Sequence, residues 1–268
     1  MATLRTEALI LRSVDFGESD RIFHLLVPDA GRLTVIAKGA RRSVKRFAGT
    51  LDLFNHLQVQ VEQRRSSAMS RLDGARLIRH FAPLREDATR FALGCYLLEL
   101  LDRLSPEGGN RHDMARLFRF ALSALAMIAS RAPDGRLRMI LELRALDALG
   151  LRPELRHCVQ CGREPTGGPG IGFHVGDGGP LCAACGLGRT DLLRVHLGTL
   201  RALEQGLRLD LDHLDRLVLP SQALAEARQL VSRFQRFHVG VELSSERFLT
   251  RMLETRGPSD GGAASGAA

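Results

Sequence analysis

Long apolar runs and tryptophan are both missing from this chain of 268 residues. Its longest apolar stretch of helical character, near residues 124–129, is far shorter than the ~20 residues that a membrane-spanning helix needs. The apolar run at residues 8–11 is bounded by Glu7 and Arg12, so we expect no signal peptide. The chain has only five cysteines, which favours a reducing compartment, the cytoplasm, over a disulfide framework.

The motifs of several enzyme classes are missing as well. The chain has no P-loop, no Gly-x-Ser-x-Gly turn and no paired-carboxylate motif. The glycines at 170 and 172 lack the full spacing and the strand–turn–helix context of a dinucleotide-binding loop. The sequence therefore gives no residue a catalytic role, and we expect a protein that is not an enzyme.

Both lysines of the chain fall in one basic segment, RLTVIAKGARRSVKR, at residues 32–46. No acidic residue lies between Asp29 and Asp52. Because such a concentration of positive charge repels itself unless it is solvated or meets anions, the segment predicts a polyanionic partner. The candidate contact residues are Arg32, Lys38, Arg41, Arg42, Lys45 and Arg46.

The positive charge of the chain is concentrated in its N-terminal part. Residues 1–80 carry 14 basic and 8 acidic side chains, a net charge of +6, and the remaining residues carry 24 and 22, a net charge of +2. An arginine-rich composition explains the preference for arginine over lysine but not this asymmetry. The asymmetry indicates that the N-terminal part binds nucleic acid or another anionic surface.

Residues 7–80 alternate between apolar and polar side chains, which is typical of β-strands. Leu57, Val59 and Val61, for example, are separated by single polar residues. Five short strands in so short a region predict a small barrel at residues 1–82, with the OB-fold as the leading candidate. The expected strands are residues 7–14, 21–27, 33–38, 54–62 and 69–79.

Helical spacing replaces this alternation from Pro83 onward. We therefore predict an α+β protein with a helical domain at residues 83–157 and 186–256, interrupted by an insert at 158–185. The Gly/Ala/Ser tail, residues 257–268, is expected to be disordered. The expected helices are residues 86–104, 112–131, 136–149, 197–208, 221–238 and 245–254.

The insert begins and ends with a C-x2-C pair, and twenty residues separate the two pairs. This spacing is typical of a site in which four thiolates hold one zinc ion. Such a site is closed and tetrahedral, so the metal is structural and leaves no position for a substrate. Gly162 and Gly186 follow the two pairs and allow the left-handed turn of a zinc knuckle. The predicted ligands are Cys158, Cys161, Cys182 and Cys185.

Three blocks of the sequence resemble the RecO family of bacterial recombination mediators, and together they cover nearly the whole chain except the tail. The first is EALILRSVDFGESDRIFHLLVPDAGRLTVIAKGARRSVKR, residues 7–46, and the second is LREDATRFALGCYLLELLDRL, residues 84–104. The third runs from CVQCG through LCAACG, residues 158–186, and is followed by HVGVELSSERFL, residues 238–249.

The resemblance implies an OB-fold domain, a helical domain and a zinc module. It also implies a DNA repair protein of the RecFOR pathway that binds single- and double-stranded DNA, anneals complementary strands and acts at the nucleoid without enzymatic turnover. Its implied partners are RecR, RecF, RecA and the C-terminal tail of SSB. The implied DNA contacts fall on Lys38, Arg41, Arg42, Lys45 and Arg46.

Aromatic side chains that could stack on nucleobases are scarce. Tyr96 is the only tyrosine, and the N-terminal region offers only five phenylalanines, most of which are expected in the core: Phe16, Phe23, Phe47, Phe54 and, at its edge, Phe81. We therefore predict that DNA binding rests on phosphate contacts and depends steeply on salt. For the SSB tail we expect an apolar groove flanked by arginines of the helical region, drawn from Arg116, Arg119, Arg131, Arg136 and Arg138.

Three other interpretations remain open. A zinc-ribbon adaptor that binds nucleic acid, such as a transcription-associated factor, would share the basic barrel and the four thiolates. An interaction module could present the same basic segment to an acidic protein tail. A zinc hydrolase or deaminase is disfavoured, because the four-cysteine site is closed and the H-x-E element is missing.

Overall fold

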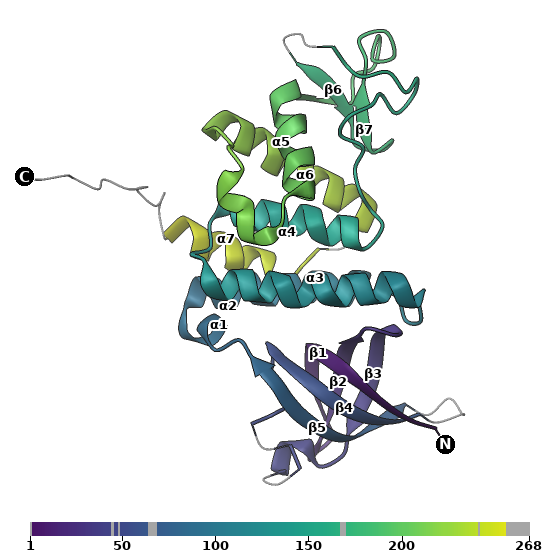
Figure 1. Ribbon diagram of the computed structural model, residues 1–268, viewed down its shortest axis with the longest axis vertical. Helices are drawn as coiled ribbons and strands as arrows, with labels where there is room; N and C mark the ends of the chain where they lie inside the picture. Colours follow the sequence, from purple (N-terminus) through teal and green to yellow (C-terminus); the bar gives the residue numbers. More distant parts are fainter. Residues whose placement is uncertain are drawn as a thin grey trace, which may run out of the picture.

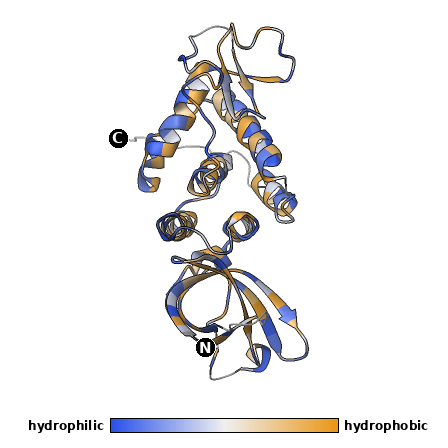
Figure 2. Ribbon diagram, turned by 90° about the vertical axis from the view of Figure 1, so that its right-hand side faces the viewer, coloured by the Kyte–Doolittle hydropathy of each residue, from blue (hydrophilic) through white to orange (hydrophobic). Residues whose placement is uncertain are grey.

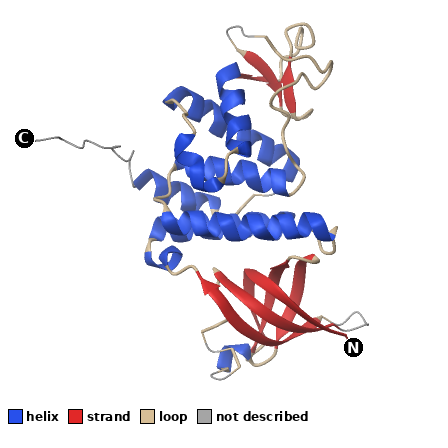
Figure 3. Ribbon diagram, viewed as in Figure 1, coloured by secondary structure: helices blue, strands red, loops and turns tan. Residues whose placement is uncertain are grey.

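The computed structural model of the protein describes residues 2–43, 46–47, 49–63, 69–166, 170–240 and 242–255. A β-barrel occupies one end of the long axis, helices form the middle, and a small sheet lies at the opposite end (Figure 1). Figure 3 shows the same separation of strands and α-helices. The α+β class predicted from the sequence is confirmed. The predicted tail at 257–268 lies outside the described residues.

Five strands close the barrel in the order β1-β2-β3-β5-β4. All neighbours pair antiparallel except β3 and β5, which pair parallel. Such a five-stranded Greek-key barrel is the OB-fold that the alternation predicts. The strands are β1 (Ala2–Phe16), β2 (Asp20–Val27), β3 (Gly31–Ala37), β4 (Asn55–Gln63) and β5 (Ser70–His80).

The interior of the barrel has its own apolar core. Leu57, Val59 and Val61 of β4 are at most 1% exposed, as their spacing predicts, and Phe23 of β2 is fully buried beside them. The strands curve round this core, with hydrophobic and hydrophilic residues alternating along them (Figure 2). Strand β1 is longer than predicted because it serves two neighbours. Its first half pairs with β4, and its second half pairs with β2.

Local signals in the sequence set where the main helices begin. The side chains of Asp87, Asn110 and Asp134 each accept a hydrogen bond from a backbone N–H in the first turn of the helix that follows. The α-helices are α1 (Pro83–Glu86), α2 (Ala88–Leu104), α3 (Arg111–Ser130), α4 (Gly135–Ala148), α5 (Leu197–Arg208), α6 (Ser221–Val239) and α7 (Glu246–Thr255), and the 3-10 helices are η1 (Ala40–Arg42) and η2 (Leu211–Arg216).

Helices α2 and α3 lie across one end of the barrel (Figure 1). Leu26 of β2 points away from the barrel interior and joins the core of the helical layer. The His24 ring nitrogen Nδ1 lies 2.6 Å from a carboxylate oxygen of Asp102 on α2. Gly31 has a φ of 72°, and a Cβ there would lie 2.5 Å from the Pro106 carbonyl oxygen, so only glycine allows this close approach.

The small sheet has the strand order β7-β6-β8 and was not predicted from the sequence. Its strands are three or four residues long, too short for alternation to indicate them. Strand β8 follows the second cysteine pair, so the sheet extends past the range expected for the insert. The strands are β6 (Ile171–His174), β7 (Gly179–Leu181) and β8 (Leu192–Val195).

Candidate nucleic-acid interface and metal centre

Residues 38–43 of the basic segment follow β3 and lie at the end of the barrel that faces away from the α-helices (Figure 3). Gly39, with a φ of 68°, turns the chain out of the strand and into η1. The backbone N–H of Arg41 donates to the carbonyl oxygen of Ser19 at 3.0 Å, and the N–H of Gly39 donates to the Asp20 carboxylate at 2.8 Å. These bonds fix the first half of the segment to the turn between β1 and β2.

Two acidic side chains of the β1–β2 hairpin pair with the segment. The Lys38 ammonium lies 2.7 Å from the Asp20 carboxylate, and together with the Gly39 N–H it lowers the pKa of that carboxyl below its usual value. Arg41 lies 3.5 Å from the Asp15 carboxylate. Because these pairs are at the surface, Lys38 remains 55% exposed and Arg41 38% exposed, and water and anions can reach both cations.

The rest of the segment is also accessible where the structure describes it. Arg42 is exposed, and its guanidinium has no ion-pair partner among the described residues. The Arg46 side chain is exposed, donates to the Lys38 carbonyl oxygen and lies 4.4 Å from the centre of the Phe47 ring. Lys45 lies outside the described residues. Lys38, Arg41, Arg42 and Arg46 thus come together at one end of the barrel.

The structure separates Arg32 from the other residues predicted to bind DNA. Its guanidinium donates to the Asp102 carbonyl oxygen at 2.8 Å and to the Glu107 carboxylate at 3.1 Å, both in the helical part of the chain. Arg32 and Lys38 stand at opposite ends of β3, which places them roughly 20 Å apart at about 3.3 Å per residue. Arg32 therefore joins the barrel to the helices and leaves the predicted set.

Phe16 is the residue of this surface that the sequence did not indicate. Phe16 is 51% exposed at the end of β1, and Val14, two residues earlier, is 41% exposed. All residues from 12 to 18 are exposed, because β4 no longer pairs with β1 here. The signal available in the sequence was the position of the aromatic ring directly before the Gly17-Glu18-Ser19-Asp20 turn.

The four predicted metal ligands converge in the small sheet region. Their sulfur atoms all lie within 4.8 Å of one another, and the Sγ atoms of Cys161 and Cys182 are 3.7 Å apart. Tetrahedral Zn–S bonds of about 2.3 Å place neighbouring sulfurs about 3.8 Å apart, so the cluster fits a zinc module. Figure 1 shows the cysteine-bearing loops beside β6 and β7, at the far end of the molecule from the barrel.

The backbone N–H groups around Cys158 favour the thiolate form of this residue. Burial raises the pKa of the Cys158 thiol, but the backbone N–H groups of Cys182, Cys161 and Gln160 outweigh it and lower that pKa to about 6. A thiolate at neutral pH is the form that binds metal. The knuckle glycine Gly162 has the expected left-handed φ of 74°.

The second knuckle differs from the prediction. Gly186 has no positive φ, and its N–H reaches the Cys182 carbonyl oxygen at 2.9 Å without one. The left-handed residue is Gly188, with a φ of 77°. The hydrogen bond from Gly186 to Cys182 therefore closes the turn around the cysteine pair, and the left-handed residue comes two positions later, at Gly188.

The arginines expected to flank one groove in the helical region fall in different places. Arg131 and Arg136 line one cavity of about 370 Å³, floored by Leu137 and Ile140 of α4 together with leucines around η2. Arg136 Nε is buried there without a hydrogen-bond partner among the described residues. Arg116 instead donates to backbone carbonyl oxygens at the end of α4.

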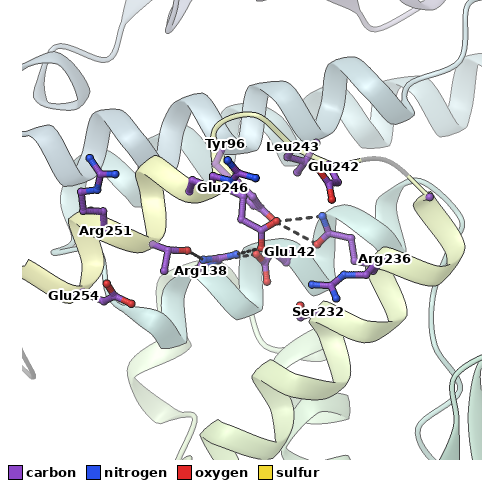
Figure 4. Close-up of a pocket in the computed structure, with 14 residues that line it drawn as sticks. Tyr96, Arg138, Glu142, Ser232, Arg236, Glu242, Leu243, Glu246, Arg251 and Glu254 are labelled. Carbon is purple, nitrogen blue, oxygen red and sulfur yellow. Dashed lines mark hydrogen bonds and ion pairs between the residues drawn. The ribbon is translucent and has the colours of Figure 1, made fainter. Parts of the chain in front are cut away.

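Arg138 is enclosed in a second, polar cavity of about 650 Å³ between α4, α6 and α7. Its guanidinium donates to Glu142 at 2.8 Å and to Glu246 at 3.0 Å, and it lies 5.0 Å from the centre of the Tyr96 ring (Figure 4). The Arg138 guanidinium is paired with Glu142 of α4 and with Glu246 of α7, so it holds α7 to α4. It is not available for the groove expected from the sequence.

Comparison with known proteins divides the chain at the same place as the structure, between the barrel and the helices. The family profile described as "Recombination protein O N terminal" matches residues 1–81, and "Recombination protein O C terminal" matches residues 85–247. A DNA repair protein RecO of Anaeromyxobacter dehalogenans is 36% identical over 98% of this chain and 100% of its own length. The RecO proteins of Myxococcus xanthus and Symbiobacterium thermophilum are 34% and 32% identical over 92% and 96% of this chain.

Together with these matches, the basic OB-fold barrel, the helical layer and the four-cysteine module identify the chain as a DNA repair protein. The chain belongs to the RecO family, as the resemblance in its sequence predicts. Where the structure describes the chain, none of its helices combines the length and the apolar character that a membrane span requires.

Proposed function

We propose that this protein is a recombination mediator that binds single- and double-stranded DNA through the basic end of its barrel. The contact residues are Lys38, Arg41, Arg42, Lys45 and Arg46. The observation that carries the proposal is an acid-free stretch of chain, anchored by its backbone to the β1–β2 turn, in which Lys38, Arg41, Arg42 and Arg46 remain accessible. Neutralising phosphates on two strands at one surface lowers their mutual repulsion, which is how such a surface promotes annealing.

The wider role follows from family membership. The protein helps RecR, together with RecF, to load RecA onto DNA covered by SSB, and it acts at the nucleoid. It performs no turnover, since positioning of strands and partners is sufficient for each of these steps. The four cysteines hold one structural Zn²⁺, which stabilises the small sheet and takes no part in DNA chemistry.

The direct test of the mediator role is annealing of complementary oligonucleotides coated with SSB. Wild-type protein is expected to accelerate annealing, and the variant Arg41→Ala/Arg42→Ala is expected to lose most of that acceleration. Arg194→Ala, which removes an exposed arginine of β8 far from the barrel, serves as the matched control. Unaccelerated annealing by the wild-type protein would contradict the mediator role and leave a zinc-ribbon adaptor as the better account.

The acidic, apolar tail of SSB is proposed to bind in the cavity between α4 and η2. Arg136 lines it, and its guanidinium can hold a terminal carboxylate by two parallel hydrogen bonds while the leucines below receive an apolar side chain; Arg131 lines it too but is paired with Asp215. A peptide that copies the tail is expected to bind at micromolar strength and to lose about tenfold in affinity with Arg136→Ala or with an amidated terminus. Arg119→Ala, on exposed surface of α3, is the control. Equal binding by the amidated peptide would exclude recognition of the carboxylate.

A further inference from the structure

The outer half of β1 forms a ribbon with β2 that stands free of β4. Val14 pairs with Ile22 and Phe16 pairs with Asp20, so these residues share one face of the ribbon. Phe23, the residue of β2 that follows Ile22, points to the opposite face and is fully buried in the barrel core. Val14 and Phe16 therefore point away from the core, onto the outer face of the barrel.

The same face continues across β3. Ile36 pairs with Ile22 on one side and with Arg71 of β5 on the other, and it alternates with Val35 and Ala37, which are both fully buried in the core. Apolar side chains of three neighbouring strands thus lie side by side and are not fully covered. We call this set, Val14, Phe16, Ile22 and Ile36, the outer apolar patch.

The helices cover only the other end of this face. Leu26 and His24, further along β2, meet the helical layer, and His24 reaches Asp102. At the end occupied by Phe16 every residue from 12 to 18 is exposed. The patch therefore stays open to solvent at the same end of the barrel as the basic segment.

Positive charge borders the patch. Lys38 pairs with Asp20, the residue directly across from Phe16, and Arg71 lies beside Ile36. Arg41 donates to the Gly17 carbonyl oxygen, one residue beyond Phe16. The nearby carboxylates of Asp15 and Asp20 are paired with Arg41, Lys38 and Arg21, and Glu18 of the adjacent turn is exposed without an ion-pair partner among the described residues. Arg71 and the exposed cations of the basic segment place positive charge beside the patch as well, so an occupant that combines a flat apolar surface with negative charge fits it.

We infer that the outer apolar patch is a stacking platform for unpaired nucleobases, with the Phe16 ring as its principal contact, so that the barrel distinguishes single strands from duplexes. This rests on the proposed DNA binding by the adjacent basic segment. A single strand offers free base faces and phosphates at the same time, whereas the bases of a duplex are already stacked on one another. The phosphates reach Lys38 and Arg41 while a base covers the ring.

The test compares three probes of equal length: a single-stranded oligonucleotide, an abasic single strand with the same phosphates, and a duplex. Phe16→Ala is expected to weaken binding of the single strand by at least about fivefold, the lower range of base–aromatic stacking. Binding of the abasic strand and of the duplex should change less than twofold. Phe16→Tyr keeps the ring and should restore the wild-type affinity. Phe237→Ala, which removes a 63% exposed ring on α6, is the matched control.

Each outcome separates this inference from the proposed function. If Phe16→Ala weakened binding of the normal and the abasic strand equally, Phe16 would contact the sugar–phosphate backbone and not a base, which would overturn stacking. Unchanged binding of all three probes together with weaker binding of RecR would assign the patch to a protein partner instead. Duplex binding by the wild-type protein tests the basic segment independently, because it needs no free base. Phe16 is half exposed, so its removal should leave the melting temperature within a few degrees.

Discussion

Two β-structures stand at opposite ends of the helical layer, and they are stabilised differently. The barrel closes on itself and buries an apolar core of its own, including Phe23, Val35 and Leu72. The described residues of the cysteine module form no separate core, since Ile171 and Phe173 of its sheet pack into the core of the helices. The comparison teaches that the barrel is a self-sufficient scaffold with an outer surface free for a ligand, whereas the module packs on its neighbours and would gain its remaining stability from the proposed metal.

Replacing one of the four cysteines is expected to have the largest effect, because it should destabilise the cysteine module and leave the barrel folded. Cys182→Ala should cost about 5 kcal/mol or more of module stability, since a structural zinc contributes roughly 10 kcal/mol to folding. Hydrogen exchange should accelerate in residues 171–195 and remain slow in β4. Cys95→Ala, a half-buried thiol on α2, is the control. Metal analysis of the wild type should give one zinc per chain, and a metal-free protein with normal exchange in the module would contradict the account.

The second test concerns the contact between the barrel and the helices at Asp102. The Asp102 side chain is 4% exposed, and it lies 2.6 Å from His24 and 3.8 Å from Arg32. Asp102→Ala removes the carboxylate that His24 and Arg32 share, while Arg32 keeps the backbone carbonyl oxygen of residue 102 and Glu107, so we expect a loss of about 1–3 kcal/mol in unfolding free energy. Because the barrel has its own core, it should melt as a separate unit in this variant.

Calorimetry of Asp102→Ala should therefore show two transitions where the wild type shows one. The exposed pair of Asp15 and Arg21 provides the comparison, and Asp15→Ala should cost less than about 1 kcal/mol. A single transition with the barrel lost at the same temperature as the helices would show that the barrel is not self-sufficient.

A smaller, pH-dependent effect is expected where α7 meets α2. Burial raises the pKa of the Glu99 carboxyl, but hydrogen bonds from the Ser245 hydroxyl and from the N–H groups of Ser245 and Ser244 outweigh it and lower that pKa. The stabilisation is present above the ordinary glutamate pKa of about 4.3 and is lost as the pH falls through the lowered value. The protection factors of the α7 amides, which correct for the intrinsic pH dependence of exchange, should fall in acid in the wild type. Glu99→Gln should remove this pH dependence of the protection factors. A pH-independent wild type would disprove the assignment.

The sequence predicts the parts of the molecule whose signals are local. Alternation identified all five barrel strands, and spacing alone identified the four cysteines that converge. The positions that the sequence could not predict depend on contacts between segments far apart in the chain. Arg32 belongs to the basic segment by sequence, but its position at the start of β3 directs it to the helices. Phe16 is apolar, but only the structure shows that β4 stops pairing with β1 before it and that the described residues leave it half exposed. The strands of the small sheet are too short to carry a pattern.

The central claim, that the barrel binds DNA through its basic end, is tested most directly by the salt dependence of duplex affinity. We compare the wild type with Arg41→Ala/Arg42→Ala/Lys45→Ala, whose folding should be unchanged because exposed charges contribute little to stability. The account predicts weaker binding and a slope of log K against log salt concentration that is shallower by roughly 0.9 for each phosphate that the variant no longer neutralises. An unchanged affinity and an unchanged slope in the triple variant would contradict it.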